Sequence, residues 1–162
     1  ADLTGADLTK ADLSRTQLTA AKLTGATLRE AQAIGTVLEA ADLTDADLTL
    51  AHLYFARMHH ALLRDADLSY ALIVGSELNE ADLFRARLSP VVLQSVSLIY
   101  AGLTDADLSG ARVFYTDFTN AETAGIKYAD AVWLHNTATD GSAGPNVGGS
   151  AAVVNPEASR LR

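Results

Sequence analysis

Large apolar residues recur in this chain every five positions, starting from the opening stretch ADLTGADLTKADLS. Leu3, Leu8 and Leu13 are the first of these central residues, and the register runs without an insertion to Trp133, giving 27 pentapeptides over residues 1–135. Ala or another small residue stands two positions before most central residues. Any fold of this chain must therefore bury one large side chain in every five residues.

A period of five excludes both regular elements as the main structure. On an α-helix five residues advance by 500°, so successive central residues would lie about 140° apart and spread around the whole circumference. On one long strand an odd period would send alternate central residues to opposite faces. Ala-Asp-Leu is instead typical of a very short strand with Ala and Leu pointing inward and Asp outward. The other two residues of each unit must then turn a corner.

The corner residues suit tight turns. Gly5 and Gly110 stand at the second corner position, after Thr or Ser, and a type II turn needs a positive φ there. Pro90 occupies the same position with φ locked negative, so we expect a different turn or a bulge at residues 89–91. A chain that turns in this way coils around a Leu/Ala core, with its coils paired backbone to backbone at ~4.8 Å, and forms a solenoid.

The tandem A-D-L-[ST]-x pattern of residues 1–135 resembles the pentapeptide-repeat family. The resemblance implies an all-β fold: a right-handed quadrilateral β-helix with four pentapeptides per coil, about seven coils in all and ~30 Å tall. It divides the chain into this solenoid at 1–135 and a Gly/Ser/Asn-rich segment at 136–162 that forms a cap and loop, for which packing on the solenoid is one alternative. We expect Trp133 to plug the last coil, since an open end would expose apolar surface and unpaired strand edges.

With 20 residues per coil, residues 20 apart stack, and the outward positions form four faces, numbered here from the units centred on Leu3, Leu8, Leu13 and Leu18. The third face differs from the others because ten of its 21 outward positions are apolar or aromatic. Such a strip usually marks an interface or a surface covered by the same chain, so cover by the C-terminal tail, a homodimer and a different partner all remain open. The ten residues are Ile34, Tyr54, Phe55, Leu72, Val74, Val92, Phe114, Tyr115, Val132 and Leu134.

The first and second faces carry stacked carboxylates. The chain has 20 acidic and 12 basic residues and a net charge of −8, which argues against direct nucleic-acid binding. One interpretation of the carboxylates, which we favour, is solubility. The other is a ladder of charge that resembles duplex DNA, as in the pentapeptide-repeat proteins that bind DNA gyrase and protect it from quinolones. This acidic wall comprises Asp42, Asp45, Asp47, Asp65, Asp67, Asp82, Asp105 and Asp107.

We expect no catalytic, cofactor or metal site. Cysteine is absent, which excludes disulfides and thiolate ligands. His59 and His60 lie near carboxylates and are the best candidates for a weak metal site, but solvated surface histidines are far commoner. The paired carboxylates stand on convex walls with no pocket to desolvate them.

The sequence thus predicts a non-catalytic interaction or scaffold module that binds an unknown protein partner through flat acidic and apolar walls. Gyrase binding is the alternative. No apolar run approaches the roughly 18 residues of a membrane span. The chain begins in mid-repeat at Ala1 with no plug, which suggests an upstream segment or end-to-end association of two chains. Its location is open, with the cytoplasm slightly favoured over a processed extracytoplasmic form.

Overall fold

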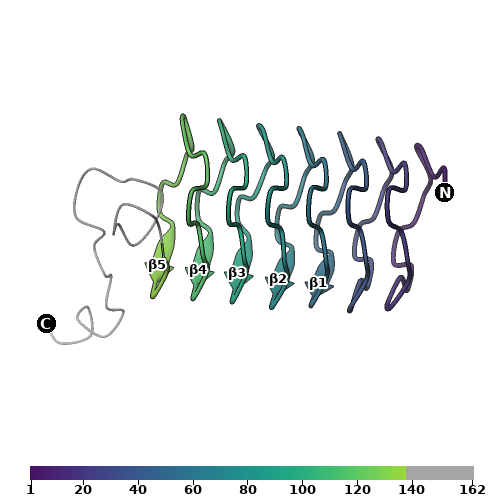
Figure 1. The fold of residues 1–162 in the computed structure, drawn as a ribbon, viewed down its shortest axis with the longest axis horizontal. Coiled ribbons are helices and arrows are strands. Elements are labelled where there is room, and N and C mark those ends of the chain that lie inside the picture. The colour runs from purple at the N-terminus through teal and green to yellow at the C-terminus, as the bar shows by residue number, and fades with distance from the viewer. Residues whose placement is uncertain (138–162) are drawn as a thin grey trace, which may run out of the picture.

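The computed structural model describes residues 1–137, which form a parallel β-solenoid whose coils stack along one axis (Figure 1). Each segment pairs in parallel with the segment 20 residues later, from the bridge Asp2 to Lys22 through to the bridge Asp117 to Thr137. The 20-residue coil implied by the resemblance is therefore confirmed. Five three-residue strands pair in chain order: β1 (His52–Tyr54), β2 (Leu72–Val74), β3 (Val92–Gln94), β4 (Arg112–Phe114) and β5 (Val132–Leu134).

The core is the set of central residues together with the small residues two positions before them. Leu48, Leu68 and Ile73 are fully buried, as are Ala46 and Ala66 beside them. Removing such a leucine side chain from water contributes about 1.5–3 kcal/mol, so the leucine columns are the main source of stability. No helix long and apolar enough to cross a membrane occurs in the part of the chain that the structure describes.

The corners adopt the predicted positive φ, and they do so well beyond glycine. Every fifth residue from Gly5 to His135 has a positive φ except Pro90. At a typical corner the amide of Ala6 donates to the carbonyl of Leu3 over 3.0 Å. The Ser89–Pro90 peptide bond is cis, so the expected change of turn at this corner is confirmed.

The third face is the one on which the described residues form strands longer than a single bridge. All five strands lie there, and they hydrogen-bond into one parallel sheet that runs along the solenoid. In each strand the middle residue points into the core, as Leu53 and Ile73 do. The flanking residues point outward, so the apolar strip predicted from the sequence stands on a continuous sheet.

At the corner between the third and fourth faces, where alanine is usual, one column of buried residues holds four polar side chains, with Ala56 and Val96 between them. Ser76 Oγ donates to the carbonyl of Leu53 over 2.8 Å and accepts from the amide of Ala56 over 3.0 Å. Ser76 therefore binds two backbone groups of the preceding coil, at the corner that follows β1. Equivalent positions in other coils hold Thr36, Thr116 and Asn136, all buried.

Candidate protein-interaction surface

The third face presents apolar side chains at fixed spacing because its strands hold them in register. Phe55 is 64% exposed and Tyr115 is 60% exposed, which is high for aromatic residues. Because the strands pair in register, His52, Leu72 and Val92 form one column along the face. Among the ten residues predicted for this surface, five are exposed and five are half-buried. The exposed residues are Ile34, Phe55, Tyr115, Val132 and Leu134, and the half-buried ones are Tyr54, Leu72, Val74, Val92 and Phe114.

A groove of about 710 Å³ runs along the edge of this face, at the corner with the second face. Its apolar middle is formed by Leu50, Tyr70 and Pro90 on one side and by Leu72 and Val92 on the other. Leu50 and Tyr70 lie outside the ten apolar residues predicted from the sequence, and the hollow was not predicted. The repeat pattern carries no information on depth, and Pro90, which lines the hollow, is the departure from the repeat at this corner.

The ends of the groove are polar. At one end Lys10 Nζ lies 3.5 Å from Glu30 Oε2, and both side chains are exposed. At the other end the guanidinium of Arg112 lies over the ring of Phe114, 5.6 Å from its centroid. The groove is thus apolar in the centre, with an ion pair at one end and the guanidinium of Arg112 at the other.

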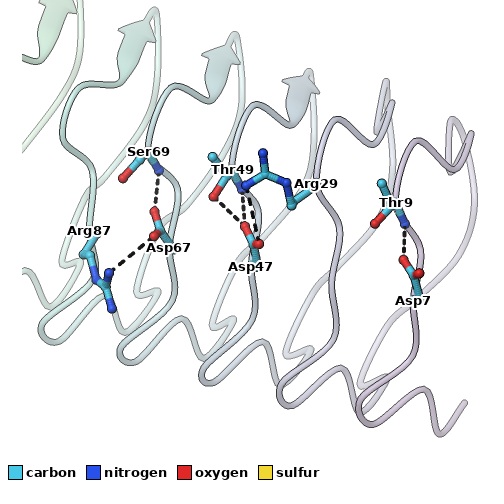
Figure 2. A network of polar contacts seen from close by, with 8 residues as sticks. All are labelled: Asp7, Thr9, Arg29, Asp47, Thr49, Asp67, Ser69 and Arg87. Atoms are coloured by element: carbon cyan, nitrogen blue, oxygen red, sulfur yellow. Dashed lines mark hydrogen bonds and ion pairs between the residues drawn. The ribbon is translucent and has the colours of Figure 1, made fainter.

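The carboxylates of the acidic wall are held by local hydrogen bonds. Asp47 Oδ1 accepts from the amide of Thr49 over 2.9 Å, and Asp67 Oδ1 accepts from the amide of Ser69 over the same distance (Figure 2). This contact, from an Asp to the amide two residues on, is an Asx turn that satisfies the first backbone donor of the corner. Sequence analysis treats these carboxylates as surface charge and misses this role, although the spacing Asp-x-Ser/Thr carries it.

The same hydrogen bonds lower several carboxyl pKa values. The hydroxyl and amide of Thr44, together with the hydroxyl of Thr24, hold the pKa of Asp42 below its usual range despite partial burial. The hydroxyl and amide of Ser109 and the charge of Lys127 do the same for the pKa of Asp107. These groups are therefore firmly ionised at neutral pH, unlike a carboxyl used as a general acid.

Basic side chains interrupt the acidic wall. Asp47 stacks on Asp67 as predicted, but the next residue in that column is Arg87, whose guanidinium pairs with Asp67 (Figure 2). Four of the eight predicted wall residues take part in ion pairs between coils. The pairs are Arg29 with Asp47, Arg85 with Asp65, Arg87 with Asp67 and Arg64 with Asp82. The wall consequently alternates in charge over much of its length. Asp42, Asp45, Asp105 and Asp107 complete the predicted set, with Asp45 and Asp105 exposed at corners.

The histidines are engaged by single neighbours. His59 Nε2 lies 2.7 Å from Glu77 Oε2, and His60 Nδ1 lies 3.4 Å from Glu80 Oε2. No group of three metal-binding side chains occurs among residues 1–137. His59 and His60 therefore each contact one carboxylate.

Trp133 lies at the end of the described solenoid. Its side chain is half-buried, packs against the core and has its ring centroid 5.6 Å from that of Phe118. Within the described residues its Nε1 is buried without a hydrogen-bond partner. The predictions for the tail beyond Thr137 lie outside the described residues.

Similarity to known proteins extends over most of the chain. The family model for pentapeptide repeats matches in 8 copies over residues 1–39, 34–69, 61–98 and 76–113. None of the curated proteins compared gives a significant match.

Solved structures with a similar fold were also found. HetL, a pentapeptide-repeat protein involved in heterocyst differentiation regulation in Nostoc sp. strain PCC 7120, is 30% identical, with a TM-score of 0.54. The match covers 87% of this chain and 63% of HetL, so the chain spans less than two thirds of that protein. Rfr23 from Cyanothece 51142 is 26% identical over 60% of this chain and 63% of its own, with a TM-score of 0.45. QnrB1, a plasmid-mediated fluoroquinolone resistance protein, is 20% identical over 81% of this chain and 77% of its own, with a TM-score of 0.42.

Proposed function

The chain belongs to the pentapeptide-repeat family, and from this premise we propose that it is a non-catalytic interaction module that binds a protein partner through its third face. The proposal takes the solenoid as a right-handed, quadrilateral β-helix of about seven coils over residues 1–135, with residues 136–162 as a cap and loop. It assigns the ten apolar residues of the third face to the interface and the acidic wall to solubility and corner formation.

One observation carries the proposal: exposed aromatic and aliphatic side chains stand on a continuous sheet. Phe55 and Tyr115 each project from a corner next to a strand, and Tyr54 and Phe114 project from the strands themselves. Side chains fixed on a rigid sheet lose little conformational freedom on binding, which favours association. Aromatic anchors of this kind dominate the energetics of many interfaces.

A photo-reactive amino acid at position 54 tests the assignment of the interface. We expect covalent adducts with a protein partner from Tyr54, and their loss when Phe114→Asp is added on the same face. The matched control places the reactive group at Thr104, which is half-buried and outward-facing on the first face. Adducts that form at position 104 and not at position 54 would place the interface on the acidic wall instead.

Gyrase binding remains the competing proposal, and the ion pairs of the acidic wall count against it. A duplex presents an unbroken series of phosphates at one charge per ~1.7 Å of axis, whereas Arg64, Arg85 and Arg87 neutralise carboxylates along this wall. We expect no effect of the protein on gyrase supercoiling at low micromolar concentration. Inhibition of supercoiling, or protection from a quinolone, would favour the gyrase alternative.

A further inference from the structure

The third face complements itself when two chains lie antiparallel, and we propose that its partner is a second copy of this chain. This inference rests on the proposed function and specifies its partner. Tyr70, Leu72 and Val74 lie in the fourth of the coils counted from Ala1, near the middle of the apolar strip that runs from Ile34 to Leu134. A two-fold axis that passes through this coil, perpendicular to the solenoid axis, brings most of the apolar strip of one chain onto that of the other.

Such an axis makes each column of the face meet the same column of the second copy in reverse order. Leu72 then meets Leu72 of the other chain, and Val74 meets Val74. Ile34, two coils before the axis, meets Phe114, two coils after it. Apolar side chains therefore face apolar side chains at the centre and at both flanks of the interface.

Charges along the groove support the antiparallel arrangement. Lys10 begins the corner column and Asp130 ends it, so opposite charges meet at both ends of the dimer. Glu30, which pairs with Lys10 in its own chain, comes opposite the coil that carries Arg112 of the other, and Arg112 makes no ion pair within residues 1–137. In a parallel pair, with the axis along the solenoid, Lys10 would instead meet Arg15 at like charge.

The dimensions of the face predict a weak dimer. Seven coils at ~4.8 Å give a face ~30 Å long, and a width of roughly 15 Å gives about 900 Å² buried in total, below the 1,200–2,000 Å² of stable complexes. Association should therefore depend on concentration in the micromolar range, and a covalent trap is the appropriate probe.

Because the chain has no cysteine, introduced cysteines can cross-link the dimer and distinguish an antiparallel from a parallel arrangement. We would introduce Leu72→Cys, Ile34→Cys and Phe114→Cys as three separate single variants and oxidise them under mild conditions. The antiparallel dimer predicts rapid disulfide formation by Leu72→Cys alone. It also predicts mixed disulfides when Ile34→Cys and Phe114→Cys are combined, at least tenfold faster than either variant forms alone. Asp45→Cys, exposed on the first face, is the control and should not cross-link.

Each outcome bears on the inference. A Leu72→Cys dimer without the mixed Ile34–Phe114 product would overturn the antiparallel arrangement, because a parallel pair brings only equivalent coils together. Cross-linking of none of the variants above the Asp45→Cys control would overturn the dimer itself. If the photo-reactive Tyr54 variant still captured a different protein, the proposed function would stand with another partner.

Discussion

At the residue scale, the aspartate of each repeat is a structural group before it is a surface charge. Asp107 Oδ1 accepts the amide of Ser109 over 2.9 Å, at the point where the chain leaves its short strand for the corner. A neutral oxygen could accept the same hydrogen bond, but the carboxylate is the stronger acceptor. This accounts for stacked aspartates on the solenoid despite the repulsion between them.

Replacing this acceptor should weaken the fold locally. We predict that Asp107→Ala lowers the free energy of unfolding by about 1 kcal/mol, the usual net value of one hydrogen bond, and that Asp107→Asn retains most of it. Glu122→Ala, at the same repeat position on an exposed site, should change stability by less than about 0.5 kcal/mol. Chemical denaturation followed by circular dichroism measures all three. Equal losses in Asp107→Ala and Glu122→Ala would refute the role given to the carboxylate.

The lowered pKa values of Asp42 and Asp107 predict acid sensitivity with a definite sign. Because each folded-state pKa lies below that of an unperturbed aspartate, the unfolded chain binds more protons at acid pH. The stabilisation is complete at neutral pH and is lost as the pH falls below about 4 and through the folded-state pKa. We predict that wild-type protein loses more stability between pH 6 and pH 3 than a variant carrying Asp42→Asn and Asp107→Asn. Denaturation midpoints at the two pH values test this, and parallel losses would contradict it.

At the scale of the element, the coil could be predicted from the sequence, but the difference between its faces could not. The five-residue period fixes which residues enter the core, and the buried Leu68 and Ala66 are as expected. At the corners that follow β1 and β4, backbone groups bond to side chains of the next coil. The side chains are Ser76 and Asn136, which the repeat pattern does not single out. The sequence does carry a signal for this difference: at this corner alone, polar residues stand where alanine is usual.

Removal of one member of the buried polar column tests this account. Ser76→Ala leaves the carbonyl of Leu53 and the amide of Ala56 without the side-chain partner, and we predict a loss of about 1–3 kcal/mol. Ser69→Ala is the matched control, because at Ser69 it is the backbone amide that bonds Asp67, and alanine retains that amide. A loss no larger than that of the control would show that the column is dispensable.

Aspartate substitutions in the core and on the third face test which side chains point inward and which point outward. Leu68 is fully buried, so Leu68→Asp should unfold the solenoid. Tyr54 and Phe114 point outward from β1 and β4, so the double variant Tyr54→Asp/Phe114→Asp should keep its β signal. Loss of the circular dichroism signal in both variants would mean that the outward assignment is wrong.

At the scale of the whole molecule, sequence and structure differ most on the acidic wall and the groove. Stacking of Asp47 on Asp67 follows from the 20-residue coil and could be predicted. The pairing of Arg87 with Asp67 depends on side-chain reach, and the groove beside Pro90 depends on the shape of one corner, which the repeat pattern does not encode. The apolar strip could be predicted from the sequence, because the central residues point into the core and their neighbours must then point outward.

The central claim is that the third face is where this protein binds, and that it binds a second copy of itself. Light scattering over a range of concentrations, for the native chain and for Tyr54→Asp/Phe114→Asp, tests it most directly. The account predicts a native molar mass that rises from 17.0 kDa towards twice that value, and a variant that remains at 17.0 kDa. A native chain that stays monomeric at every concentration, or a variant that dimerises as the native chain does, would contradict it.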